Sequence, residues 1–291
     1  MNIKMIVMDM DGTLLNQDQI ISERTLNALF KAQDNEVILV LASGRSYKTL
    51  KPYGDILEMS KHKGHFICVN GAAIYDTVTN VNHVIKRLQL DEIKEIFEVC
   101  KPFEIETMAV LESSIYDYIP ESLLELKKKY RQENNIDEDV PMTAGTFRMI
   151  VDQRKNYSHI EFIKDYTGVI TPVNKICLAH TPEYLVKPYE YLLGKLSHKY
   201  NFNRTSYSWI EVMPKDISKG NAVKKLAQEN NIQLDEILVF GDGENDLSMF
   251  EVVKYSVAMG NAMETVKQAA HFITDTNNND GIAKILEEYV L

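Results

Sequence analysis

The chain has little cysteine and no long apolar segment. Its three cysteines, Cys68, Cys100 and Cys177, are widely separated and odd in number, which favours reduced thiols over a disulfide framework or a zinc site. Nowhere do about 18 apolar residues run together, and the chain does not open on a basic segment followed by a long apolar one. We therefore expect no membrane association, and a cytoplasmic location is the simplest interpretation.

The chain also has fewer basic than acidic residues. Lys and Arg number 32 against 42 Asp and Glu, which gives a formal net charge of -10. Nucleic acids and anionic membranes bind clustered Lys and Arg, so neither is expected as a partner. Any phosphate-bearing ligand must then be held by a few local cations. No heptad pattern or exposed apolar stripe stands out, and a monomer is the default expectation.

Residues 3–13 form the most distinctive stretch. An almost uninterrupted apolar run ends in two aspartates, Asp9 and Asp11, and is followed by Gly12. Such a run predicts a strand buried on both faces of a parallel sheet. Alternate residues of a strand point the same way, so both carboxylates can emerge together at its carboxyl end. Open parallel sheets bind their ligands at that edge.

Apolar runs that end in glycine or polar residues recur along the chain. We expect strands at residues 37–42, ending in Ser43-Gly44-Arg45, at 66–69, ending in Asn70-Gly71-Ala72, and at 237–240, ending in Gly241-Asp242-Gly243-Glu244-Asn245-Asp246. Ser22 and Ser218 are placed to cap the helices that follow them. Buried strands that end in glycine or polar residues and alternate with helices are typical of an α/β domain.

Residues 84–207 do not follow this pattern. The stretches there lack Gly- and Asp-rich strand ends, and we expect helices at residues 91–101, 120–133, 157–166 and 182–200 and strands at 105–111, 146–151, 173–179 and 207–213. The sequence thus predicts an α/β domain of residues 1–83 and 208–291, with a separate α+β domain of residues 84–207 inserted into it.

Three carboxylates at the ends of two buried strands, Asp9, Asp11 and Asp242, repel one another unless a cation offsets their charge. Mg²⁺ does so with one or two carboxylates, waters and a substrate phosphate. Turn formation and helix capping account for most Asp-Gly pairs. They account poorly for Asp9-x-Asp11-Gly12-Thr13 directly after so apolar a strand.

Other motif interpretations fail at single positions. Asp242-x-Glu244-x-Asp246 resembles a calcium loop, but Leu247 occupies the required glycine position and Val253 the required glutamate position. Gly241-x-Gly243-x-x-Asp246 lacks the third glycine of a dinucleotide fingerprint, and Lys219-Gly220 reverses the ending of a P-loop.

Four motifs, in chain order, resemble those of the haloacid dehalogenase superfamily: Asp9-Met10-Asp11-Gly12-Thr13, Ser43-Gly44-Arg45, Lys219-Gly220 and Gly241-Asp242-Gly243-x-Asn245-Asp246. Leu14-Leu15-Asn16, Asn70-Gly71-Ala72 and the large insertion are similar to its Cof-type sugar-phosphatase branch. This resemblance covers the whole length. It implies a Rossmann-like parallel-sheet core with an inserted α+β cap domain. It also implies a Mg²⁺-dependent phosphomonoester hydrolase that forms an aspartyl-phosphate and acts on small phosphorylated metabolites, with sugar phosphates the leading class.

The resemblance also implies roles for the acidic residues. Asp9 would be the nucleophile and a metal ligand. Asp11 would be the general acid and later the general base, with its backbone carbonyl on the metal. Asp242 would be a further carboxylate ligand. Asp246 would act through water or by orienting the ligands.

In the same resemblance four residues would bind the phosphate: Ser43, the neighbouring backbone at Gly44, Lys219 and Asn245. Ser43 and Asn245 have an alternative role as helix caps. Two roles are open for Arg45, a contact with the substrate and an ion pair with a nearby acid. The lysine run of residues 127–129 is expected to be a solvated helix face.

Other activities fit the residues less well. A phosphomutase, or a phosphatase dedicated to one sugar intermediate, would use the same acid two residues after the nucleophile. A non-catalytic protein that binds phosphorylated metabolites has no need of the proton donor Asp11. An ATPase pump is disfavoured by the lack of membrane spans and by an acid at position 11, and a dehalogenase does not need that acid.

Overall fold

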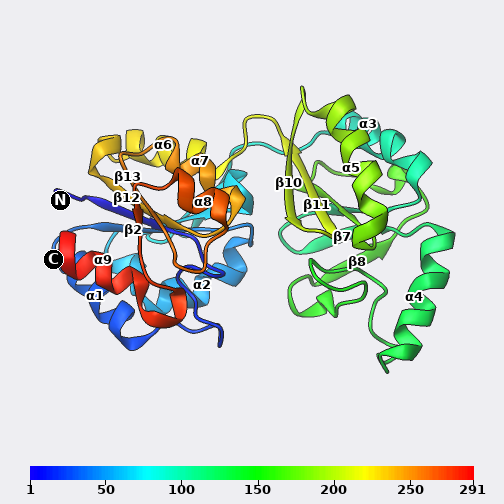
Figure 1. The fold of residues 1–291 in the computed structure, drawn as a ribbon. Coiled ribbons are helices and arrows are strands. Elements are labelled where there is room, and N and C mark those ends of the chain that lie inside the picture. The colour runs from blue at the N-terminus through cyan, green and yellow to red at the C-terminus, as the bar shows by residue number, and fades with distance from the viewer. The chain divides into compact units, whose positions relative to one another are not determined.

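The computed structural model describes the backbone of residues 1–291 and every side chain except that of Thr205. The chain divides into two units, the first formed by Met1–Ile85 and Ile217–Leu291 and the second by Lys86–Asp216. Each unit has its own sheet (Figure 1). The fold is α/β, with a Rossmann-like core that is interrupted by an inserted α+β domain, and the predicted fold class is confirmed.

An eight-stranded sheet forms the first unit, in the order β14-β13-β12-β1-β2-β3-β4-β5. Strand β1 pairs in parallel with β12 on one side and with β2 on the other. The strands are β1 (Met5–Met8), β2 (Ile38–Ala42), β3 (His65–Cys68), β4 (Ala73–Asp76), β5 (Val81–Val84), β12 (Ile237–Gly241), β13 (Tyr255–Ala258) and β14 (Phe272–Ile273). All of β1 is buried, as its apolar sequence predicts.

Helices cover both faces of this sheet. Helices α1 (Glu23–Asp34) and α9 (Gly281–Tyr289) lie on one face, and α6 (Lys219–Glu229) and α7 (Leu247–Phe250) lie on the other (Figure 1). The remaining helices of the unit are α2 (Tyr47–Ile56) and α8 (Glu264–Ala269).

The two predicted caps are confirmed. Ser22 Oγ accepts a hydrogen bond from the N–H of Thr25 at 3.2 Å, and Ser218 Oγ accepts one from the N–H of Asn221 at 3.1 Å. Each cap satisfies a backbone donor that the first helical turn leaves free. The second cap makes Lys219 the first residue of α6.

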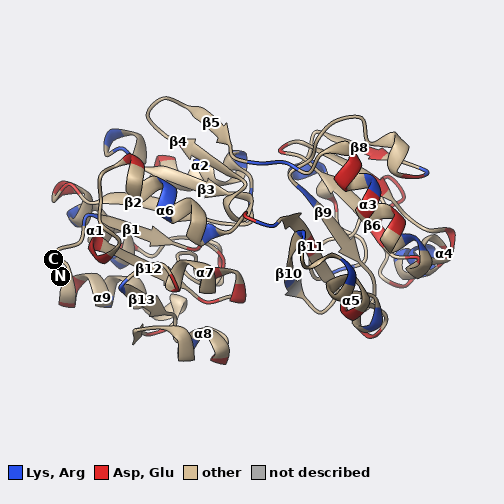
Figure 2. Cartoon of the chain, turned by 90° about the horizontal axis from the view of Figure 1, so that it is seen from above, with Lys and Arg blue, Asp and Glu red and all other residues tan. Residues whose placement is uncertain are grey.

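The second unit contains a six-stranded sheet in the order β10-β11-β9-β6-β7-β8. Its strands are β6 (Glu106–Val110), β7 (Ser114–Tyr118), β8 (His159–Phe162), β9 (Lys175–Ala179), β10 (Tyr200–Ser206) and β11 (Trp209–Pro214), and its helices are α3 (Leu90–Cys100), α4 (Glu121–Glu133) and α5 (Pro182–Leu196). Residues of α3, α5 and the sheet form its main apolar core. Figure 2 shows acidic and basic residues interspersed along these helices.

Three predictions for this part of the chain are wrong. Residues 157–166 contain strand β8 instead of a helix, because the alternating sequence His159–Phe162 pairs with β7. Residues 146–151 form no named strand, and the bridge between Gly145 and Arg148 is isolated. The second junction between the units lies at 216/217 instead of 207/208, because β11 pairs with β9.

The prediction for the lysine run is also wrong at one position. Lys127 is 1% exposed and forms an ion pair with Glu106, which is 0% exposed. Lys128 and Lys129 are solvated, as expected, and pair with acids on their own helix. Only one residue of the run lies on the buried stripe of α4, and the charge pattern alone does not reveal that stripe.

Cys68, Cys100 and Cys177 are buried, and none of them forms a disulfide within the described part of the chain, which agrees with the expected reduced thiols. Of the helices that the structure describes, none combines the length and apolar character that crossing a bilayer requires.

Candidate active site

The carboxyl ends of β1 and β12 meet at a close approach. Asp9 directly follows β1, and its N–H donates to the carbonyl of Phe240 in β12 at 3.1 Å. Gly12 has a φ of +82°, and a Cβ at this position would lie 2.4 Å from Asp242 Oδ2. Glycine is required here both for its conformation and for the absence of a side chain. The Asp-Gly pair thus lets the loop after β1 lie against the carboxylate that follows β12.

Lys219 is buried between two carboxylates. Its Nζ donates to Asp9 Oδ1 at 2.5 Å and to Asp246 Oδ1 at 2.6 Å. The lysine and Asp246 are 0% exposed, and Asp9 is 7% exposed. Burial alone would lower the pKa of Lys219, but the two carboxylates raise it well above its ordinary value. Lys219 is therefore a fixed positive charge at the strand ends.

Three carboxylates gather around this lysine. Asp9, Asp242 and Asp246 each offer an oxygen within 4.8 Å of the oxygens of the other two. Burial raises the pKa of Asp9 well above its ordinary value, and the charges of Asp246 and Asp242 raise it further, although Lys219 acts in the opposite direction. Burial also raises the pKa of Asp242 to about 6. One lysine thus leaves an excess of negative charge, which suits a hard divalent cation.

The side chains of Asp242 and Asp246 are fixed by different partners. Asp242 Oδ1 accepts a hydrogen bond from Thr13 Oγ1 at 2.6 Å. Asp246 Oδ2 accepts the N–H groups of Asp242 and Gly243 at 2.9 and 3.1 Å, while its Oδ1 accepts from Lys219. One oxygen of Asp246 therefore holds the loop after β12, and the other holds Lys219. An orienting role, or contact with a cation through water, suits it better than direct ligation.

The side chain of Asp11 is not part of this group of three carboxylates, although its charge adds to the effect of burial in raising the pKa of Asp242. Strand β1 ends at Met8, so the alternation of side chains does not extend to position 11. The Asp11 side chain is 53% exposed and forms an ion pair with Arg45, whose Nε donates to Asp11 Oδ2 at 2.9 Å. Arg45 thus pairs with an acid, which was one of its two expected roles.

The predicted phosphate-binding residues follow β2 and β12. Ser43 is buried, and its Oγ accepts the N–H of Arg45 at 3.2 Å. The cap of α2 is Ser46, and the cap of the short 3-10 helix that contains Asn245 is Gly243. Neither Ser43 nor Asn245 is therefore a helix cap, so the structure does not support their alternative role.

Sequence reasoning missed three residues at this edge of the sheet. Thr13 was part of a motif but had no assigned contact, although it bonds Asp242. Asn70 Oδ1 accepts a hydrogen bond from Asn245 Nδ2 at 3.3 Å. Asn261 Nδ2 donates to the carbonyl of Gly12 at 2.8 Å. The position of Asn70 after a buried strand was a usable signal, whereas Asn261 lies outside every motif.

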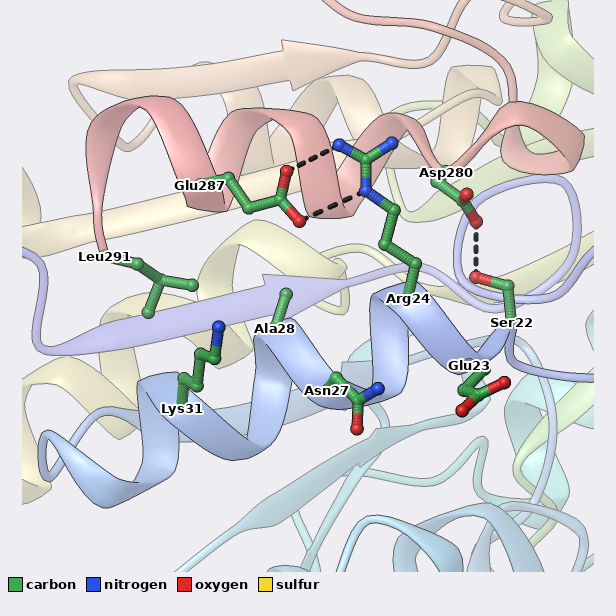
Figure 3. A pocket seen from close by; sticks show the side chains of 9 residues that line it. All are labelled: Ser22, Glu23, Arg24, Asn27, Ala28, Lys31, Asp280, Glu287 and Leu291. Carbon is green, nitrogen blue, oxygen red and sulfur yellow. Dashed lines mark hydrogen bonds and ion pairs between the residues drawn. The ribbon is translucent and has the colours of Figure 1, made fainter.

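A separate hollow of about 550 Å³ lies between α1 and α9 (Figure 3). Four of the side chains that line it are already paired with one another. Arg24 forms an ion pair with Glu287 at 2.5 Å, and Ser22 Oγ donates to Asp280 at 2.5 Å. None of the clustered carboxylates lines this hollow. We therefore place the candidate active site at the strand ends.

Comparison with known proteins agrees with this geometry. The sequence model of the haloacid dehalogenase-like hydrolase family matches residues 6–286. The chain belongs to this family. As a haloacid dehalogenase-like hydrolase it resembles YxeH of Bacillus subtilis (strain 168), designated only provisionally as a phosphatase, with 30% identity over 290 residues, 99% of this chain and 98% of that protein.

Further relatives of the hydrolase include YitU of the same organism, named 5-amino-6-(5-phospho-D-ribitylamino)uracil phosphatase. It is 28% identical over 292 residues, 98% of this chain and 97% of that protein. A haloacid dehalogenase-like hydrolase from Bacteroides thetaiotaomicron has a solved structure with a TM-score of 0.74, 28% identity and 98% coverage of both chains.

The fold is shared with a subclass IIB sugar phosphatase, BT4131, at a TM-score of 0.72 and 23% identity, with 98% of both chains covered. The predicted superfamily and its Cof-type branch are confirmed, and the enzyme is a phosphatase. Its second unit is the cap domain of this fold.

Proposed function

We propose that the enzyme is a Mg²⁺-dependent phosphomonoester hydrolase that acts on small phosphorylated metabolites through an aspartyl-phosphate on Asp9. The observation that carries this proposal is the buried Lys219 bonded to both Asp9 and Asp246, beside Asp242. Sugar phosphates are the leading substrate class. Three relatives named as phosphatases of a phosphorylated ribitylamino-uracil support a small, hydroxyl-rich leaving group.

Mg²⁺ would be held by the carboxylates of Asp9 and Asp242 and the backbone carbonyl of Asp11, with Asp246 orienting them. When bound, it supplies positive charge that offsets the charge of the phosphate. The raised pKa values of Asp9 and Asp242 fit such a site, because a cation favours the ionised carboxylates that burial disfavours.

The remaining motif residues would bind the phosphoryl group. Ser43 Oγ and the N–H of Gly44 would donate to its oxygens, as would Lys219 and Asn245. Lys219 also donates to Asp9, so it would hold the attacking carboxylate and the phosphoryl group together. Because these donors would bind the phosphoryl oxygens, Asp9 could still approach the phosphorus atom.

Hydrolysis would proceed in two displacements. In the first, a bond forms between Asp9 Oδ and phosphorus while the bond to the leaving oxygen breaks, and Asp11 gives its proton to that oxygen. In the second, Asp11 takes a proton from water, the water oxygen bonds phosphorus, and the bond to Asp9 breaks. Orthophosphate leaves, and Asp11 is protonated again. Arg45 would have to release Asp11 before it could donate a proton.

Asp11→Asn should separate substrates by their leaving groups. Loss of the proton donor should slow hydrolysis of an alkyl phosphate such as a hexose phosphate by about 10²- to 10⁴-fold. The loss should be much smaller with p-nitrophenyl phosphate, because its phenolate leaves without a proton. Single-turnover kinetics that follow release of the hexose and of p-nitrophenol would measure the two losses in the first displacement, because the second displacement is the same for both esters. Equal losses would contradict the assignment of Asp11 as the general acid.

Mg²⁺ affinity should fall about tenfold for each pH unit below about 6. Asp242, with a raised pKa of about 6, is protonated in the metal-free protein at lower pH and must lose its proton when the cation binds. At higher pH the Asp242 carboxylate is already ionised, and its contribution to the pH dependence should level off, which leaves only the contribution of Asp9. Titration calorimetry in buffers with different ionisation enthalpies would measure affinity and proton release. Affinity that does not change with pH would count against Asp242 as a ligand.

A substrate panel tests the proposed function directly. Phosphate release from sugar phosphates, nucleotides, flavin mononucleotide and pyridoxal phosphate should require Mg²⁺ and be fastest with sugar phosphates. An isomerised ester without free phosphate would instead identify a phosphomutase. Binding without turnover of any ester would identify a non-catalytic protein. Activity on a single ester would identify a dedicated phosphatase.

A further inference from the structure

The turn after β3 has a strained backbone. Val69, Asn70 and Gly71 have φ values of 50°, 51° and 102°. Asn tolerates this left-handed region, but a β-branched residue such as valine rarely adopts it. Strain of this kind persists only where the surrounding structure imposes it, and it often occurs at functional sites.

Backbone hydrogen bonds tie this turn to the motif after β2. The N–H of Val69 donates to the carbonyl of Arg45 at 3.0 Å, and the N–H of Asn70 donates to the carbonyl of Ser43 at 2.9 Å. The turn also packs against the start of α6, because a Cβ on Gly71 would lie 2.3 Å from the carbonyl oxygen of Ser218. The strained residues are therefore fixed between the Ser43 loop and the cap that precedes Lys219.

The Asn70 side chain lies between two predicted phosphate-binding segments. It is 4% exposed, and its Oδ1 accepts the hydrogen bond from Asn245 Nδ2. A Cβ on Gly44 would lie 3.4 Å from both Oδ1 and Nδ2 of Asn70. The amide of Asn70 thus lies beside the loop after β2 and is hydrogen-bonded to the loop after β12.

The orientation of the Asn245 amide follows from its neighbours. Its Nδ2 faces Asn70, while its Oδ1 lies on the side of Gly243, 2.8 Å from where a Cβ of that glycine would be. A primary amide has two N–H donors, and Asn70 uses one of them. Among the described residues the second N–H has no acceptor, so it can donate to a phosphoryl oxygen.

We propose that Asn70 is a positioning residue for phosphate binding. It accepts one N–H of Asn245 so that the other N–H can donate to the phosphoryl group, and it packs against Gly44 so that the backbone of the Ser43 loop keeps its place. Asn70 acts through these neighbours and need not touch the phosphate. The inference rests on the proposed function, because it assumes that the Ser43 loop and Asn245 bind a phosphoryl group.

Asn70→Gly tests the inference, because glycine adopts a φ of 51° without strain while the substitution removes the buried side chain that carries the amide. We expect the inhibition constant of orthophosphate and the KM of a sugar phosphate to rise about tenfold, the effect of one lost charge-assisted hydrogen bond. The unfolding midpoint should change little. The matched control is Asn231→Gly, the same substitution at an exposed residue with a φ of 54°, which should leave both constants unchanged.

A double-mutant cycle tests whether Asn70 acts through Asn245. In an Asn245→Ala background, Asn70→Gly should raise the orthophosphate inhibition constant by much less than tenfold, because only its packing beside Gly44 is then left to lose. A full tenfold rise in both backgrounds would overturn the proposed coupling. A constant within about twofold of wild type in the single variant would overturn the positioning role altogether.

A second variant covers the case in which Asn70→Gly unfolds. Asn70→Asp keeps the shape and tolerates the same backbone conformation, but it places a negative charge beside the phosphate site. It should weaken orthophosphate at least about tenfold, and unchanged binding would overturn the inference. If wild-type enzyme neither turns over esters nor binds orthophosphate, the proposed function fails first. If wild type does both and the variants match it, only the role of Asn70 fails.

Discussion

Asp9→Asn should reduce Mg²⁺-dependent phosphate release by at least about 10⁴-fold, the scale of loss when a nucleophile is removed. The asparagine keeps the shape of the side chain and can still accept the hydrogen bond of Lys219 through its amide oxygen. It cannot supply the carboxylate oxygen that would attack phosphorus. Single-turnover assays with a sugar phosphate would measure the loss, and acid-stable capture of ³²P on wild type but not on the variant would locate the covalent step.

The matched control for this variant is Asp18→Asn, the same substitution at an exposed aspartate in the same segment, which should leave activity unchanged. Circular dichroism and the unfolding midpoint would show that both variants fold. If Asp9→Asn retained wild-type hydrolysis, the covalent mechanism would be wrong, whatever the substrate.

The position of the site could be predicted from sequence because its residues follow buried strands. Runs such as residues 3–8 and 237–240 are apolar enough to identify central parallel strands. The polar residues after them must then meet at one edge of the sheet. Asp9, Asp242 and Asp246 do so in the structure.

The pairing of side chains at that edge could not be predicted in the same way. The side chain of Asp11 would continue the alternation of β1 only if the strand extended that far. The strand ends at Met8, before a turn for which Gly12 is the only signal in the sequence. The side chain of Asp11 pairs with Arg45, and Asp246 joins the cluster instead. Local patterns predict the elements, but contacts between distant loops depend on the order of strands in the sheet.

The cap domain was harder to predict because its strands are short and mostly antiparallel. Strand β8 has only four residues. It is a strand and not the expected helix because it pairs with β7. Burial of Lys127 depends similarly on the partner Glu106, which lies on a different element. A charged residue in a core is stable only with such a partner, and its sequence neighbours do not show whether one is present.

Of the variants proposed, Lys219→Met should lower the free energy of unfolding most, because it leaves Asp9 and Asp246 buried without the lysine that they share. Breaking a buried ion pair on one side costs about 3–5 kcal/mol. The loss should be greatest in EDTA at alkaline pH. Burial raises the pKa of Asp9 in the folded protein, so its ionised form destabilises the fold as pH rises above the ordinary value for aspartate. At acidic pH the carboxylates can be protonated, and the variant should recover part of its stability.

Urea unfolding at acidic and alkaline pH, with EDTA or with Mg²⁺, would measure this dependence. Lys225→Met is the matched control on the same helix, since Lys225 is exposed and its pair with Glu229 should contribute less than about 1 kcal/mol. Mg²⁺ should restore part of the lost stability of Lys219→Met, because a cation beside Asp9 replaces some of the missing positive charge. It should not restore activity, since the donor to the phosphoryl group is still absent. A variant as stable as wild type in EDTA at alkaline pH would show that the carboxylates do not depend on Lys219, and the site would then need another source of positive charge.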